Sequence, residues 1–199
     1  AATIAGGALG QSSSKQALLM AMQANGKQVV AYQWKQKITV FRRGNPSQPM
    51  IEELRFDANG QMQRITLAKP EEKHMGPLRA RKAAEIKEDV QDVMQLARRY
   101  ASPQQMAEAI QRGEIWEGQG KLRVQSRAVV LPYDELTITV NGASYLATRM
   151  DVKTQYEGSP INIAVDYDQL MNGPSMMSRM TVQIPKDMEE AAMVDGCSR

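Results

Sequence analysis

The spacing of apolar and polar side chains changes several times along this chain. Between residues 30 and 40, apolar side chains recur at every second position with polar ones between them. A period of two places successive side chains on opposite faces of a strand, so the pattern predicts one long strand with a dry face and a wet face. The dry face carries Val30, Tyr32, Trp34, Ile38 and Val40, interrupted only by Gln36.

A second strand and a hairpin are predicted next. In the run from residue 50 to 57, Glu52, Leu54 and Phe56 share one side, and alternation resumes at Met62. Asn59-Gly60 stands between these two runs. Asn-Gly in this position is a strong hairpin signal, because both residues tolerate positive φ. We therefore predict a β-hairpin that turns at Asn59-Gly60.

Other segments have the apolar spacing of helices. The first runs from about residue 12 to 24, after a group of serines that offer N-caps, and Asn25-Gly26 is expected to end it. A long helix is predicted from about residue 78 to 100, with Ile86, Val90, Val93, Ala97 and Tyr100 on its apolar side.

A short third helix is predicted to begin directly after the second. Ser102 is a good N-cap, and Pro103 suits the first helical position because its missing N–H would be unpaired there anyway. Gln105 occupies the reciprocal position of a capping box. The helix is expected to end at Gly113, which makes the pair a helical insertion between two blocks of strands.

From Ile115 the period of two returns and continues to about residue 184. On one face of the first of these runs we expect Leu122, Val124, Ala128 and Val130. Turn signals follow at Pro132-Tyr133-Asp134, Asn141-Gly142, Gly158-Ser159-Pro160 and Asn172-Gly173-Pro174. The order of one helix, three strands, two helices and about five strands predicts an α+β fold built on an antiparallel meander.

Composition narrows the class of function. The 199 residues are 42% hydrophobic and 24% charged, which is ordinary for a globular protein of one domain or two small ones. Basic residues number 25 and acidic ones 22, so the net charge of +3 gives little support to nucleic-acid binding. The single cysteine, Cys197, excludes an internal disulfide.

The sequence contains no motif that carries chemistry by itself. It has no glycine-rich phosphate loop, nucleophile elbow, HExxH helix or CxxC pair, and its one histidine, His74, stands in a polar connector. Asp166-Tyr167-Asp168 resembles the start of a calcium loop, but the turn glycine of such a loop would be Met171. We therefore expect no catalytic residues, no metal site and no cofactor.

The first ten residues are small, weakly apolar and uncharged. They are either the remnant of a secretory h-region, cut before Gln11, or a flexible tail, and both interpretations stay open. Residues 11–199 are then expected to form a single domain. We favour export, and hence a periplasmic location.

Tyr32 and Trp34 on one strand face have two interpretations. They can stack on a ligand, or they belong to the core, where aromatic residues on the inner face of a sheet more often lie. The 14 methionines suit an adaptable apolar interior in either case.

The predicted first helix, the segment Tyr32-Gln33-Trp34-Lys35-Gln36-Lys37 and the turn Phe56-Asp57-Ala58-Asn59-Gly60 resemble exported bacterial proteins of the LolA/LolB type, the lipoprotein carriers. The helical insertion and the later meander also fit, so the resemblance spans most of residues 12–185. It implies an antiparallel sheet curved into an open half-barrel, with the N-terminal helix and the two-helix insertion across its concave face. In that family the concavity holds acyl chains.

The resemblance leads to a functional hypothesis. We expect a periplasmic carrier for an apolar ligand, a lipid or an acylated protein, in which each buried methylene contributes about 0.8 kcal/mol. The residues expected to line the site are Tyr32, Trp34, Leu54, Phe56, Ile65, Val90 and Met94. A monomer with peripheral contact to the envelope membrane or to lipoproteins is expected. The alternative is an envelope interaction module with a filled core and no ligand.

Overall fold

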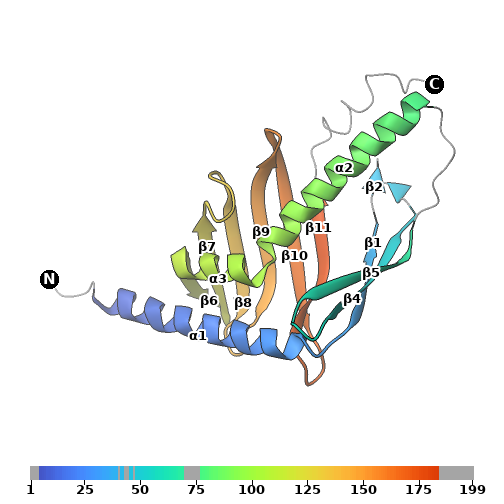
Figure 1. Ribbon diagram of the computed structural model, residues 1–199. Helices are drawn as coiled ribbons and strands as arrows, with labels where there is room; N and C mark the ends of the chain where they lie inside the picture. Colours follow the sequence, from blue (N-terminus) through green and yellow to red (C-terminus); the bar gives the residue numbers. More distant parts are fainter. Residues whose placement is uncertain (1–4, 40, 43–44, 47, 70–76, 184–199) are drawn as a thin grey trace. The chain divides into compact units, whose positions relative to one another are not determined.

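The computed structural model describes residues 5–39, 41–42, 45–46, 48–69 and 77–183 (Figure 1). They form an α+β fold with three helices and two main antiparallel sheets, of three and six strands, which confirms the predicted class. The chain divides into two compact units, a larger one of residues 1–26 and 90–199 and a smaller one of residues 27–89. Val40, His74 and Cys197 lie outside the described residues.

Six strands of the larger unit form an antiparallel meander, in which each strand pairs with the next along the chain. The strands are β6 Glu114–Gly118, β7 Lys121–Arg127, β8 Glu135–Asn141, β9 Ala147–Tyr156, β10 Ser159–Gln169 and β11 Ser175–Gln183. Their order leaves β6 and β11 as edges, so this sheet does not close into a barrel.

Two tight hairpins organise the meander. Gln119 and Gly120 both have positive φ (52° and 70°) and turn the chain between β6 and β7, where the alternation had predicted one strand. Glu157 and Gly158 (49° and 80°) do the same between β9 and β10. Two residues of positive φ match the twist of the strands they connect, which is the reason such turns join adjacent antiparallel strands. The extra hairpin raises the number of strands in this block from about five to six.

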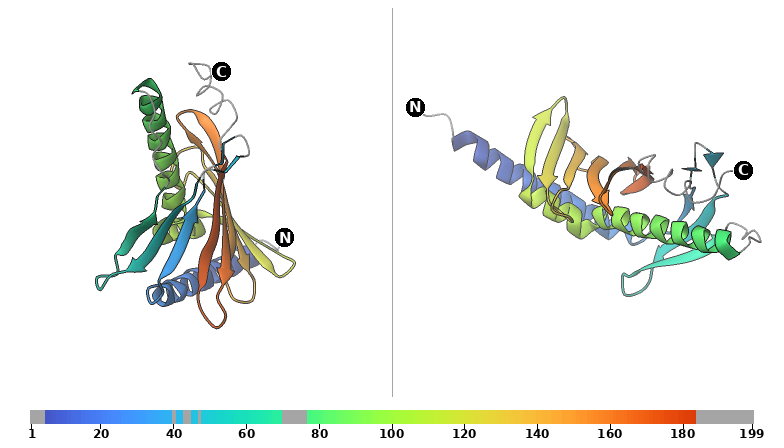
Figure 2. Two further views of the ribbon diagram at one scale, coloured as in Figure 1. Left: turned by 90° about the vertical axis from the view of Figure 1, so that its right-hand side faces the viewer. Right: turned by 90° about the horizontal axis from the view of Figure 1, so that it is seen from above.

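The helices are α1 Ala5–Val29, α2 Pro77–Tyr100 and α3 Pro103–Arg112. In the larger unit their apolar side chains form one core with the inner face of the six-stranded sheet. The views in Figures 1 and 2 show α3 beside this sheet, where it lies against β7. The helices contribute Leu18, Val93, Ala97, Tyr100, Met106, Ala109 and Ile110 to the core.

The first helix is longer than its sequence predicts. Asn25-Gly26 does not end α1, which includes residues 5–10 and continues to Val29. The Asn25 side-chain amide donates to the backbone oxygen of Ser175 over 2.9 Å, and its Oδ1 accepts from the Ser175 N–H over 2.7 Å. This tertiary pairing ties the end of the helix to the start of β11, so a local stop signal is overruled.

Two further local predictions are wrong in the larger unit. Strand β7 ends at Arg127, and Ala128 has a φ of 52°, so Ala128 and Val130 do not continue its inner face. At the start of α3 the Ser102 hydroxyl accepts from the Gln105 N–H over 3.3 Å, as predicted. The reciprocal half of the capping box is not formed, because Gln105 Oε1 is buried with no hydrogen-bond partner among the described residues.

The smaller unit holds a three-stranded antiparallel sheet in the order β1-β4-β5. Its strands are β1 Trp34–Ile38, β4 Met50–Phe56 and β5 Met62–Ala68, and a short ribbon pairs β2 Phe41–Arg42 with β3 Asn45–Pro46. The predicted long strand is therefore wrong in its length, because Val30 and Ala31 form a turn between α1 and β1.

The predicted hairpin between β4 and β5 is confirmed. Gly60 has a φ of +74°, and the Asp57 side chain accepts from the N–H groups of Asn59 and Gln61, each over 2.9 Å. These bonds to the carboxylate, first of all the one from Gln61, lower the pKa of Asp57.

Candidate functional site

The smaller unit brings three of the predicted binding residues together. Trp34 pairs directly with Leu54 across β1 and β4, and Phe56 lies two positions further along β4 on the same face. The Trp34 and Phe56 rings have centroids 6.1 Å apart and planes tilted by 49°, a favourable aromatic geometry. Leu54 is buried, whereas both rings are only half-buried. Together these three side chains form what we call the aromatic face.

The other predicted binding residues lie elsewhere. Ile65 pairs with Glu53, which places it on the opposite face of the three-stranded sheet from Leu54. Tyr32 precedes β1, outside the strand. Val90 and Met94 are half-buried residues of α2 and belong to the larger unit.

Strand β5 leaves apolar side chains accessible on both of its sides. Met62 pairs with Phe56 at the edge of the aromatic face and is 45% exposed. Ile65 and Leu67 are 38% and 48% exposed. A polar contact borders this surface, since Arg64 lies 3.4 Å from the Glu52 carboxylate. The smaller unit therefore presents exposed apolar side chains along β5, which is an edge strand of its sheet.

The second candidate region is the outer face of the six-stranded sheet, the face whose side chains do not join the core. It carries an open hollow of about 590 Å³. We call this the outer hollow; it is lined by Lys121, Arg123, Thr137, Thr139, Thr148 and Arg149. Two carboxylates, Asp151 and Asp166, complete its wall.

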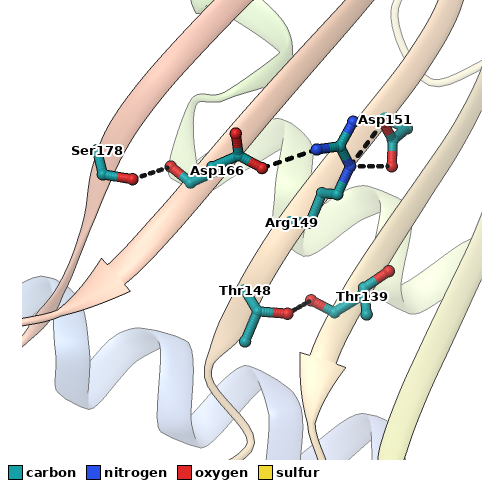
Figure 3. A network of polar contacts seen from close by, with 6 residues as sticks. All are labelled: Thr139, Thr148, Arg149, Asp151, Asp166 and Ser178. Carbon is teal, nitrogen blue, oxygen red and sulfur yellow. Dashed lines mark hydrogen bonds and ion pairs between the residues drawn. The ribbon is translucent and has the colours of Figure 1, made fainter.

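Arg149 organises the outer hollow (Figure 3). Its Nε lies 2.9 and 3.0 Å from the two Asp151 carboxylate oxygens, and its Nη1 lies 2.8 Å from Asp166 Oδ1 on the next strand. The bonds to Asp151 are the main reason that the pKa of Arg149 is raised. One guanidinium thus holds both acids of the hollow.

Two β-bulges flank this arginine. The register of β8 and β9 shifts beside Thr139, which leaves Thr148 unpaired in the ladder, and its hydroxyl donates to the Thr139 carbonyl over 3.2 Å. The register of β10 and β11 shifts beside Asp166, and the Ser178 hydroxyl donates to the Asp166 carbonyl over 3.2 Å (Figure 3). Bulges re-aim side chains and are common beside functional sites.

The register also aligns six outward residues in one row across the sheet. Each member pairs with the next, from β6 to β11, in the order Trp116, Arg123, Thr139, Arg149, Asp166 and Arg179. Trp116 is 60% exposed at the β6 end of this row. The alternation of polar and apolar residues does not predict this row, because the row follows from the register between strands. A sign of the bulges is present in the sequence, since two adjacent polar residues interrupt the alternation in β9 and again in β11, at Thr148-Arg149 and Ser178-Arg179.

A third cluster of polar side chains, formed by Tyr100, Thr154 and Asp134, is buried in the larger unit. The Tyr100 hydroxyl donates to Thr154 Oγ1 over 2.9 Å, and the Thr154 hydroxyl donates to Asp134 Oδ1. The other Asp134 oxygen accepts from the N–H groups of Val130 and Leu131. Burial, with the nearby Asp134 carboxylate, raises the pKa of Tyr100. With Asp134 only 2% exposed, this network fixes the loop between β7 and β8.

No three His, Cys, Asp or Glu side chains in the described part of the chain gather as a metal site requires. None of the described helices combines the length and hydropathy of a membrane-spanning segment. Asp166 of the Asp166-Tyr167-Asp168 segment lies in β10 and accepts a hydrogen bond from Arg149.

Comparison of the chain with models of known protein families, with curated proteins and with solved structures found no match.

Proposed function

We propose that this protein is a non-enzymatic binding protein that takes an apolar ligand, the acyl chain of a lipid or of an acylated protein, on the aromatic face. The observation that carries the proposal is the half-buried pair of Trp34 and Phe56 beside the accessible Met62. Planar aromatic side chains offer a large apolar contact area with little side-chain entropy to lose.

The inner sheet face of the larger unit, in the part that the structure describes, leaves no equal place for an acyl chain. The inner side chains of its central strands are almost completely buried by its own helices, and Leu136, Ile138 and Val165 have no exposed surface. Protein cores are close-packed, so a guest would have to displace side chains that already pack well. This favours the smaller unit as the ligand site.

The resemblance to the LolA/LolB-type carriers supplies the rest of the proposal. It includes an open half-barrel with helices across its concave side, a periplasmic location and a monomeric state. Val90 and Met94 belong to the proposal on the same ground. Fractionation of native cells tests the location: the mature protein is expected outside the cytoplasm, and an unprocessed cytosolic chain contradicts it.

Fluorescence of Trp34 tests ligand binding. In a Trp116→Phe variant Trp34 is the only tryptophan, and lysophosphatidylcholine added below its micellar concentration should shift its emission to the blue in a saturable way. Phe56→Ala should weaken binding by at least about tenfold, or about 1.4 kcal/mol. Ile65→Ala is the matched control, since it truncates an apolar side chain on the opposite face and should leave binding nearly unchanged.

The alternative function is an interaction module without a ligand. The filled core of the larger unit is the observation that favours it. An unchanged Trp34 emission at saturating lysolipid, in a folded protein, would refute the carrier proposal and leave this one.

A further inference from the structure

The outer hollow has cations that its own carboxylates do not neutralise. Lys121 and Arg123 lie two residues apart on β7 and so point to the same face, about 7 Å apart along the strand. Among the described residues neither has an ion-pair partner. Both side chains are exposed. By contrast Arg127, further along the same strand face, lies 3.8 Å from the Glu135 carboxylate.

The acids that line the hollow are already held. Asp151 accepts from both Nε and Nη2 of Arg149, and Asp166 accepts from Nη1 of the same guanidinium. Because both carboxylates bond Arg149, their charge is balanced there and not by the cations of β7. An anion entering between Lys121 and Arg123 therefore meets positive charge, with three cations against two carboxylates around the hollow.

The donors of the hollow match a group with several acceptor oxygens. Arginine offers a planar fork that bonds phosphate bidentately, and lysine offers a point charge with three donors. The Thr137 and Thr139 hydroxyls face the same hollow from β8. Trp116 pairs directly with Arg123 and supplies an exposed ring for the part of a ligand that carries the phosphate.

We propose that the outer hollow is a binding site for a phosphate group, held by Lys121 and Arg123 and flanked by Trp116. The pairing of β9 with β10 sets the frame of this site, because it places Asp166 opposite Arg149, while Asp151 lies two residues further along β9. The phosphate belongs either to a soluble phosphate ester or to a phospholipid headgroup. The proposal uses the larger unit alone and does not depend on the apolar ligand of the aromatic face.

Two binding measurements on the full chain test it and identify the source. Calorimetric titration with inorganic phosphate and with glycerol 3-phosphate reports soluble ligands. Cosedimentation with vesicles of phosphatidylcholine, with and without phosphatidylglycerol, reports headgroup binding. Binding of the soluble phosphates, or preferential sedimentation with the anionic vesicles, supports the site and names its source. Binding should weaken at high salt, because the contacts are ionic.

Matched variants separate a site from general charge. Arg123→Gln should reduce binding at least about tenfold, and Lys121→Gln should reduce it to a similar or smaller extent. Arg127→Gln removes the same charge from the same strand face and should leave binding within about twofold of the parent protein. The proposal is overturned if no probe binds, or if Arg127→Gln weakens binding as much as Arg123→Gln does.

Discussion

Replacing Asp134 by Ala should destabilise the larger unit more than any single substitution on its surface. Its carboxylate accepts from two backbone N–H groups, those of Val130 and Leu131, and from the hydroxyl of Thr154. Asp134 is 2% exposed, so water has little access to replace these bonds. Hydrogen bonds to a charged group contribute about 1.5–3 kcal/mol each, and the loop can relax to recover part of the loss. We expect the free energy of unfolding to fall by about 3–5 kcal/mol.

The rest of the network sets a graded series. Thr154→Val removes the central hydroxyl and leaves the Tyr100 hydroxyl and one Asp134 oxygen without their partner, at a cost of about 1–3 kcal/mol. Tyr100→Phe removes one neutral bond at the end of the chain of contacts and should cost about 1 kcal/mol. Asp168→Ala is the matched control, since this aspartate is exposed on β10, and it should change stability by less than about 0.5 kcal/mol.

Urea unfolding measures the series. In a Trp34→Phe background the remaining tryptophan, Trp116, belongs to the same unit as Asp134 and reports its unfolding. Circular dichroism followed in parallel checks that the transition is shared. If Asp134→Ala shifts the unfolding free energy no more than Asp168→Ala does, the network does not stabilise the loop and this reasoning is wrong.

Three further predictions concern backbone geometry and alkaline pH. Gly113→Ala should lower the free energy of unfolding in urea by about 1–3 kcal/mol, because the new Cβ would lie 2.7 Å from Val124 Cγ1 and 2.6 Å from the Ala109 oxygen. Gly118→Ala is the control, since a Cβ at Gly118 meets open space and should leave stability nearly unchanged. Gly60→Val should lower the melting temperature and cost about 1–2 kcal/mol, since φ there is +74°; an unchanged melting temperature would contradict the turn. Burial raises the pKa of Tyr167 to about 12 from an ordinary value of 10.0, so stability should hold below pH 10 and fall as the pH rises toward 12, by about 1.4 kcal/mol per pH unit. In a pH titration followed by phenolate absorbance, Tyr167 and Tyr100 should ionise at a higher pH than the exposed tyrosines. Ionisation of every tyrosine near pH 10 in the folded protein would refute this.

Alternation and turn residues were sufficient for most strands. Leu136, Ile138 and Val140 on β8 are all buried while the residues between them are not, as their period of two predicts. The turn signal at Asn141-Gly142 is different, because its glycine is required by packing and not by a positive φ. Asn141-Gly142 does lie between two paired strands, but positive φ occurs at Tyr145 and not at Gly142. Gly142 is needed for close packing instead, since a Cβ there would lie 2.7 Å from the Gly120 carbonyl oxygen.

The face of the sheet on which a predicted binding residue lies is also not given by apolar spacing alone. Ile65, Leu54 and Phe56 are all expected from the sequence to line one site. The pairing of Ile65 with Glu53 places it on the other face, and a shift of one residue in register would have reversed this. The face of Ile65 is decided by the length of the turn between β4 and β5, because the pairs from Phe56–Met62 to Glu52–Thr66 follow one another without a shift. A hydrophobic pattern does not record that length.

The outer hollow shows why a polar strand face is the hardest place to find a function from sequence. Alternating polar residues are the default for the wet side of an antiparallel sheet, so Arg123, Thr139 and Arg149 carry no signal when taken singly. Their pairing across three neighbouring strands is what makes them one surface. Arg149 meets Asp166 through the regular pairing of β9 with β10. Thr148 is the extra residue of a bulge against β8, between the pairs Val140–Ala147 and Thr139–Arg149. Deleting Thr148 would join the Val140–Ala147 and Thr139–Arg149 pairs into one regular ladder, so Arg149 should stay on the outer face. The deletion and Thr148→Ala should therefore both keep the fold and keep phosphate binding in the calorimetric titration, and a deletion variant that loses both would refute this register.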